Sequence, residues 1–476
     1  MAADREGTTL GNIDHFVVLM LENRSFDNML GWLDSPDNPP PFRPLPGAPR
    51  VNGLAGGPRA NPVPPGLPGA PGLVRAGRAT NPRTPDPDPG EGYAHTCVQL
   101  YGRAPGPPAC ADADPAPMDG FVRDYIDVLR ADGRALTPAE YGQIMDGFPP
   151  ASVPVISTLA HAYAVCDRWH CSVPSETLPN RAFALAATSD GMVDNTPYTR
   201  WLELDVPTIC NRIQDAGVPG LTWRVYYDLA DVLPATWLLF PRLRPFLLSH
   251  FSGMDTFLRD AAAGTLPSFA LIEPRFVLDP NDQHPPASVL LGEELMRTVY
   301  QALRQGAGWE RTLLLITYDE HGGCYDHVPP APAVPPDPAA PPGQYGFRFD
   351  RLGVRVPAVL VSPWIEAGTV FRAPGPDGAE RALDHTSWLR TVERRFGLAP
   401  LTDRDAAAPD VAAALGRIRP RTDAPVLPPP GQAAPGPWST RRAAATAWRA
   451  LAAARVAAPH AEDAAARVRL RRMLGS

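Results

Sequence analysis

The chain has 476 residues, of which 44% are hydrophobic and 20% charged, so it is long and apolar enough to bury a large core. Its formal net charge of −7 argues against a general nucleic-acid binder, which normally carries a basic balance. No run reaches the roughly 18 apolar residues of a membrane span. The core begins near residue 12, which leaves no room for a secretion signal. We therefore expect a cytoplasmic protein from the sequence as written, and a secreted one if a leader is missing from it.

Two apolar runs organise the chain. Residues 16–21 and residues 312–317 are each too short for a lone helix and are typical of buried strands. In open α/β sheets, chemistry lies just beyond the carboxyl ends of the strands. Both runs are followed by side chains with oxygen ligands, namely Glu22, Asn23, Asp319 and Glu320. The first run alone is better explained by a strand and a helix start capped by Ser25 or Asp27. The two runs together favour a single metal site.

Further along the chain, strands and helices are predicted to alternate. Helices are expected over residues 118–131, 154–163, 287–305 and 384–396, and strands over residues 221–227, 269–272 and 356–361. This alternation predicts an α/β fold with a mostly parallel central sheet. Residues 36–90 are crowded with proline and glycine, so little regular structure is expected there. Loops of that length are usually functional or disordered.

A hydroxyl group stands at the start of another predicted helix. Thr177 precedes Pro179 and the helix-forming run of residues 182–187. The free N–H groups and the positive dipole at a helix N-terminus suit a phosphate group. From these residues alone, a simple N-cap role for Ser175 or Thr177 is the better explanation.

The six cysteines match no zinc-binding spacing. Cys97 and Cys110 flank a loop rich in proline and glycine, and they can bridge in an oxidising compartment. Connectivity cannot be read from sequence, so a disulfide between them stays open.

The composition changes near the C-terminus. Residues 411–437 are predicted to be a proline-rich linker, and residues 438–476 are rich in alanine and arginine, which favours helix. This extension is expected to dock on the body. The alternative is a basic helix in transient contact with an anionic membrane surface.

Seven motifs in order along the chain carry a family resemblance. They are residues 22–31 (ENRSFDNMLG), 145–149 (MDGFP), 177–181 (TLPNR), 281–285 (NDQHP), 317–328 (TYDEHGGCYDHV), 350–363 (DRLGVRVPAVLVSP) and 384–387 (DHTS). From about residue 12 to residue 410, the chain resembles the phosphoesterase family of bacterial phospholipases C, plant nonspecific phospholipases C and a bacterial acid phosphatase. A single motif is a weak signal, but the ordered set is a strong one.

The resemblance implies a fold like that of alkaline phosphatase and the sulfatases, with a catalytic domain over residues 12–410. It implies hydrolysis through a covalent phospho-enzyme on Thr177. The family's active-site histidines fall on His95, His284 and His327. We expect substrate contacts at Asn180, Arg181 and His250. The family's metal ligands fall on Glu22, Asn23, Asp319 and Glu320. Oxygen ligands of this kind favour a divalent calcium, magnesium or manganese ion over zinc.

Three functions remain open on this basis. The motifs most resemble those of plant nonspecific phospholipases C. This resemblance favours a metal-dependent phosphodiesterase of phospholipase C type, acting on a phospholipid. A phosphomonoesterase like the family's acid phosphatase is the second. An inert binder of phosphate or lipid head groups is the third, and the joint presence of nucleophile and ligand residues disfavours it. The apolar segment of residues 237–251 either walls an approach for lipid or belongs to the core.

Overall fold

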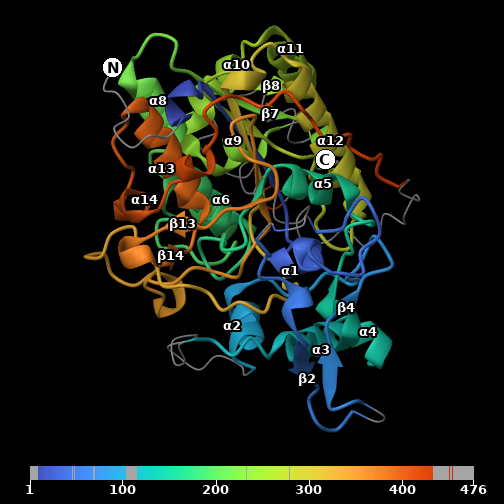
Figure 1. Ribbon diagram of the computed structural model, residues 1–476. Helices are drawn as coiled ribbons and strands as arrows, with labels where there is room; N and C mark the ends of the chain where they lie inside the picture. Colours follow the sequence, from blue (N-terminus) through green and yellow to red (C-terminus); the bar gives the residue numbers. More distant parts are fainter. Residues whose placement is uncertain are drawn as a thin grey trace.

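A central sheet of eight strands runs through the molecule (Figure 1) in the order β12-β6-β11-β10-β1-β9-β7-β8. The computed structural model describes residues 9–44, 47, 49–67, 70–102, 115–231, 233–277, 279–431, 450 and 453. The strands of the sheet are β1 (His15–Leu21), β6 (Ala164–Val165), β7 (Trp223–Tyr227), β8 (Phe251–Gly253), β9 (Phe269–Ile272), β10 (Thr312–Tyr318), β11 (Ala358–Val361) and β12 (Thr369–Val370). Within this described sheet, β11 alone runs antiparallel to its neighbours. The prediction of a mostly parallel sheet is confirmed.

The two central strands, β1 and β10, have every side chain buried. Strands of a parallel sheet that is covered on both faces read as continuous apolar runs, and this is the pattern that predicted them. They pair in register from His15 opposite Thr312 to Leu21 opposite Tyr318. The residues after Leu21 and after Tyr318 therefore emerge side by side at the carboxyl edge of the sheet.

Helices cover both faces of the sheet (Figure 1). On one side lie α6 (Thr177–Ala186), α8 (Ile209–Ala216) and α13 (His385–Phe396), and on the other side lie α5 (Pro154–Ala162) and α12 (Val289–Gln305). The remaining helices of this part are α7 (Tyr198–Trp201), α9 (Ala235–Leu239), α10 (Leu247–His250), α11 (Met254–Ala263) and α14 (Asp403–Ala407). Each helix predicted within the described residues is present, with ends that differ by a few residues.

A smaller lobe lies at the carboxyl edge of the sheet, at the lower end of Figure 1. It contains α1 (Phe26–Leu30), α2 (Tyr93–Tyr101), α3 (Phe121–Ala131) and α4 (Pro138–Gly142), with the short strands β2 (Ala60–Pro62), β3 (Leu73–Arg75), β4 (Gly77–Arg78) and β5 (Asp146–Gly147). Its apolar side chains, among them Phe121, Tyr125 and Tyr325, form a core of their own. The described residues of the segment 36–90 have little regular structure, as predicted; Leu54 and Val74 pack in this lobe, whereas Val51 packs against the main core.

The end of the described chain packs on the body. Val411, Ala412 and Leu415 are buried in the main core, and Arg421 donates to the backbone oxygen of Ala162. The predicted helical extension of residues 438–476 lies outside the described residues, apart from residues 450 and 453. None of the described helices is both long and apolar enough to cross a membrane.

Candidate active site

The ends of β1 and β10 bring the predicted acidic residues together. The backbone N–H of Asn23 donates to Oδ1 of Asp319 at 3.1 Å. The backbone N–H of Glu320 donates to the same oxygen at 2.8 Å. Asn23 has a φ of 58°, in the left-handed region that asparagine tolerates better than most residues. These contacts hold the loop after β1 against the loop after β10.

Arg181 joins the two loops from a third element. Its Nε lies 3.0 Å from Oδ2 of Asp319, and its Nη2 lies 3.2 Å from Oε1 of Glu22. All three side chains are buried, and the guanidinium group lies over the ring of Phe276. The residue predicted to bind substrate therefore neutralises two of the predicted metal ligands.

Thr177 is the first residue of α6, and its side chain is fully buried. Residues four apart on a helix share a face, so Thr177 lies on the same face as Arg181, which reaches the acidic residues. Its hydroxyl oxygen has no hydrogen-bond partner among the described residues. A buried hydroxyl without a partner is unusual and calls for an explanation.

Asn180 shapes the loop that leads into α6. Its Oδ1 accepts from the N–H of Val173 at 2.9 Å, and its Nδ2 donates to the backbone oxygen of Ser175 at 2.9 Å. A further bond from Nδ2 reaches the oxygen of Glu176 at 3.1 Å. Asn180 was predicted to contact substrate. In the structure, its side-chain amide instead fixes the backbone that precedes Thr177.

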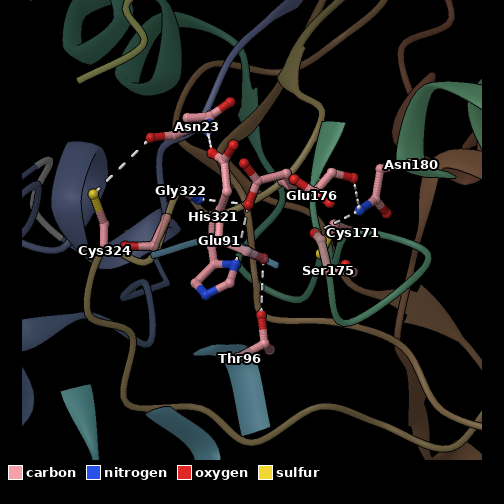
Figure 2. A network of polar contacts seen from close by, with 12 residues as sticks. Asn23, Glu91, Thr96, Cys171, Ser175, Glu176, Asn180, His321, Gly322 and Cys324 are labelled. Carbon is pink, nitrogen blue, oxygen red and sulfur yellow. Dashed lines mark hydrogen bonds and ion pairs between the residues drawn. The ribbon is translucent and has the colours of Figure 1, made fainter. Parts of the chain in front are cut away.

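More carboxylates surround this point than the sequence indicated. Figure 2 shows Asn23, Glu91, His321 and Glu176 in one network of polar contacts, and Nδ2 of Asn23 donates to Oε2 of Glu91. Burial raises the pKa of Glu91 and of Glu320 well above its ordinary value. Burial also raises the pKa of Asp319 to about 7, although Arg181 opposes the shift. Such a concentration of buried negative charge is costly unless a cation compensates it.

His284 lies between two carboxylates of this cluster. Its Nδ1 is 3.4 Å from Oε2 of Glu22, and its Nε2 is 2.9 Å from Oδ2 of Asp88. Burial lowers the pKa of His284, but Asp88 and Glu22 outweigh burial and raise it well above the ordinary value. Both ring nitrogens therefore face carboxylates, and these charges favour the protonated form of the ring.

His95 lies at the rim and is arranged differently. It is on α2, its side chain is 45% exposed, and its Nδ1 lies 2.8 Å from Oδ1 of Asp124. No described residue forms a hydrogen bond with its Nε2. The bond with Asp124 raises the pKa of His95 against the effect of burial, and the charge of Glu176, the neighbour of Thr177, adds to the rise. A protonated Nε2 is thus available to a bound substrate.

Two glycines explain the close approach of these loops. A Cβ atom at Gly322 would lie 2.3 Å from the backbone oxygen of Asn23, and one at Gly323 would lie 2.5 Å from that of Gly90. Both glycines have positive φ, at 59° and 65°. The two glycines after His321 therefore let the β10 loop contact both the β1 loop and the smaller lobe.

Several buried side-chain oxygen atoms of the site are of the chemical kind that binds a divalent cation. Oγ1 of Thr177, Oδ1 of Asn23 and Oε1 of Glu320 are buried and have no hydrogen-bond partner among the described residues. Like the carboxylates of Glu22 and Asp319, they are hard oxygen ligands, the kind that calcium, magnesium or manganese prefers.

A second group of potential ligands joins α1 to the loop after β10. Among the described residues, Asp27, Asp326 and His327 have ligand atoms within 4.8 Å of one another. This group already holds a cation, because Nε of Arg355 lies 2.9 Å from Oδ1 of Asp326 and its Nη2 lies 3.1 Å from Oδ1 of Asp27. His327, predicted as a catalytic histidine, directs Nδ1 at Asp27 and Nε2 at Asn52.

His250 lies far along the sheet from these residues. Its ring stacks on Trp223, with centroids 4.4 Å apart, at the amino end of β7. The acidic cluster is at the opposite, carboxyl edge. In the segment 237–251, the side chains of residues 237–240 are buried in the main core, whereas Leu248 is exposed. The first four residues of that segment are therefore core, whereas the residues after Phe240 are mostly partly or fully exposed.

Four polar residues of the site have no counterpart among the predicted ones: Asp88, Glu91, Gln99 and Asp124. The first two end the loop rich in proline and glycine, where the sequence offers length as the only signal of function. The other two lie on helices, where a polar residue is usually solvated. Both are buried here, and burial of this kind cannot be read from a single sequence.

Known proteins of similar sequence identify the family of the chain. The model of the Phosphoesterase family matches residues 13–399. "Non-specific phospholipase C3" of Arabidopsis thaliana is 36% identical over 436 residues, which cover 89% of this chain and 77% of the relative. "Non-hemolytic phospholipase C" of Pseudomonas aeruginosa is 27% identical over 436 residues, covering 83% of this chain and 56% of the relative. A solved protein of the alkaline phosphatase superfamily from Vibrio parahaemolyticus matches 56% of this chain and 65% of its own, at 10% identity and a TM-score of 0.34.

The chain belongs to the Phosphoesterase family. It is a hydrolase that acts on phosphoric ester bonds. The family resemblance drawn from the seven motifs is confirmed.

Proposed function

We propose that the protein is a metal-dependent phosphodiesterase of phospholipase C type, which acts through a phosphothreonine on Thr177. One observation carries the proposal. The Thr177 hydroxyl is buried at the N-terminus of α6, on the helix face that presents Arg181 to Glu22 and Asp319, and no described residue forms a hydrogen bond with it. The names of the relatives supply the substrate class, a phospholipid.

Glu22, Asn23, Asp319 and Glu320 would hold the divalent cation. When bound, the cation would supply positive charge to the phosphoryl oxygens and lower the pKa of the Thr177 hydroxyl. A free threonine hydroxyl is a poor nucleophile and needs such activation. At the start of α6 the N–H of Leu178 donates to Oδ1 of Asn195 and Pro179 has no N–H, so the N–H of Thr177 would bind a remaining phosphoryl oxygen.

The protein's own side chains then carry out the transfer. Oγ1 of Thr177, after losing its proton to solvent, attacks phosphorus, the bond from phosphorus to the alcohol oxygen breaks, and His95 donates its Nε2 proton to the departing alkoxide. Water cleaves the phosphothreonine in the second step and returns a proton to His95. His95 suits this role better than His284, because both nitrogens of His284 are already engaged with carboxylates. For His250 and His327, a role in the reaction stays a prediction.

The charges around the site favour a diester over a monoester. A monoester dianion needs one more positive contact than a diester monoanion. Arg181 and His284 are already paired with Glu22, Asp319 and Asp88. Buried carboxylates nearby would repel the second charge of a monoester. A phosphomonoesterase therefore remains the second candidate.

Turnover of p-nitrophenylphosphorylcholine and p-nitrophenyl phosphate, with calcium, magnesium or manganese added, tests the proposal. We expect the diester to react faster by at least about tenfold, which corresponds to ~1.4 kcal/mol. A tenfold preference for the monoester would make the protein a phosphomonoesterase. Lack of turnover on both substrates would favour an inert binder. Thr177→Ala should be inactive on either substrate.

The compartment can be proposed from one cysteine. Cys97 is disulfide-bonded, and Cys110, its predicted partner, lies outside the described residues. Disulfides persist in oxidising compartments, which favours export over the cytoplasm. The test is to treat intact native cells with a thiol-alkylating reagent and to map the modified cysteines. Export predicts that Cys97 stays unmodified, and an alkylated Cys97 would contradict it.

A further inference from the structure

Asp124 lies buried beside His95 and has no part in the chemistry described above. It is on α3, is 3% exposed, and its Oδ1 lies 2.8 Å from Nδ1 of His95. Its Oδ2 accepts from Nε2 of Gln99 at 2.7 Å. Both carboxylate oxygens are therefore held by side chains of α2, four residues apart.

Gln99 connects this pair to the loop after β10. Its Nε2 also donates to the backbone oxygen of Gly90 at 2.6 Å, so two acceptors fix the orientation of the amide. The remaining Oε1 lies 2.7 Å from Nε2 of His321, the residue directly after Glu320. The side chain is 1% exposed. This arrangement links the histidine at the rim to the loop that would hold the cation.

Gly90 packs directly against the imidazole ring of His95. A Cβ atom at this position would lie 2.1 Å from Nδ1 of His95, so any side chain would displace the ring. The ring has one carboxylate on Nδ1, a glycine against its edge and no described partner on Nε2. It is free to present only Nε2 to a ligand.

We propose that Asp124 is the positioning residue of His95, and that Gln99 holds Asp124 in place. The carboxylate accepts the Nδ1–H bond and fixes the ring, so that Nε2–H points to the alcohol that leaves phosphorus. This inference rests on the proposed function, because it requires His95 to be the proton donor. The matching residue one turn along, Asp127, has a side chain that is 60% exposed and pairs with Arg130.

The proton balance follows from this arrangement. The Nε2 proton passes to the alkoxide as the P–O bond breaks, and the imidazole becomes neutral while Nδ1–H stays on Asp124. The water that cleaves the phosphothreonine returns one proton to Nε2. Asp124 stays ionised throughout and stabilises the protonated ring before transfer.

The charges that face His95 come from three elements. They are Asp124 on α3, Glu176 before α6 and Asp194 in the loop after α6, and all three raise the pKa of His95. Asp124 alone is in contact and has the largest effect. A general acid works only while protonated, so activity should fall as pH rises through this raised pKa.

The test compares Asp124→Asn with Asp127→Asn. The His95 ring is titrated by NMR, and phosphatidylcholine hydrolysis is followed against pH. In Asp124→Asn we expect the pKa of His95 to fall by about one unit or more. The pH at which the rate falls on the alkaline side of the profile should decrease by the same amount. Above that pH, hydrolysis should be about tenfold slower than in the wild type. In Asp127→Asn, neither the pKa of His95 nor the pH of the alkaline fall in rate should change.

Two outcomes separate this inference from the proposed function. An unchanged His95 titration in a folded Asp124→Asn protein overturns the role of Asp124. If the rate of the His95→Gln variant still falls at the same alkaline pH, His95 is not the proton donor. Should Asp124→Asn fail to fold, Gln99→Met replaces it. That variant should slow phosphatidylcholine hydrolysis but spare p-nitrophenylphosphorylcholine, whose leaving group needs little protonation, and an equal loss on both overturns the proposal.

Discussion

Thr177, Asn23 and Glu320 each present a buried oxygen that lacks a hydrogen-bond partner among the described residues. Buried polar atoms are normally hydrogen-bonded, and three hard oxygen atoms without such a bond fit the cation that we propose. Glu22 and Asp319 already interact with Arg181. The arrangement therefore supports a cation bound at the ends of β1 and β10, with Arg181 balancing the remaining negative charge.

Two single substitutions distinguish this site from the group formed by Asp27, Asp326 and His327. Glu320→Gln should lose the bound cation and nearly all turnover, because a charged ligand is removed from the proposed centre. His327→Ala should keep the cation, since Arg355 already compensates Asp27 and Asp326. Metal content after dialysis, measured by mass spectrometry, provides the check. The reverse pattern would move the metal site to the second group.

At the residue scale, the sequence predicted the ligands that directly follow apolar strands. Glu22 and Asp319 could be found because β1 and β10 are fully buried runs, and a polar residue at their ends stands out. Asp124 could not be found, since it lies on a helix whose polar positions usually face solvent. Its burial depends on the approach of α2 to α3, which is a tertiary contact.

At the element scale, Arg355 ties the start of β11 to the loops after β1 and β10. It is fully buried, bonds both Asp27 and Asp326, and donates to the backbone oxygens of Asn52 and Asp167 at 2.8 Å each. Removing one partner of a buried ion pair leaves uncompensated charge. These loops thus depend on one guanidinium group for their shape.

We expect Arg355→Gln to lower the free energy of unfolding by about 3–5 kcal/mol. Arg130→Gln is the matched control, because its pair with Asp127 is exposed at 51% and 60%. That change should cost about 1 kcal/mol or less. Urea unfolding of both variants measures the difference. Equal losses would show that the Arg355 network contributes no more than a surface pair.

The elements themselves were largely predictable, because each long helix and buried strand has a clear apolar pattern. The order of the strands was not. β1 lies between β10 and β9, whose sequence positions are far from it, and no local signal encodes that pairing. The smaller lobe was also missed as a unit, since its core comes from residues on both sides of the loop rich in proline and glycine.

At the scale of the whole molecule, the described chain past residue 410 is part of the body. Val411 and Leu415 are 0% and 1% exposed and pack in the main core. A chain that ends at residue 437 should keep both turnover and melting temperature, because the site and this packing are intact. A chain that ends at residue 410 should lose about 3–6 kcal/mol of stability from these two side chains. Full stability of the shorter chain would contradict this.

The central claim is that Thr177 becomes phosphorylated during hydrolysis of a diester. Acid quenching during turnover of a phosphatidylcholine substrate, followed by intact-mass analysis and peptide mapping, tests it most directly. The account predicts a phosphate adduct on the peptide that contains Thr177, absent from Thr177→Ala, together with a loss of turnover of at least about 10³-fold in that variant. Wild-type protein without any adduct, or a Thr177→Ala variant with full activity, would contradict the account.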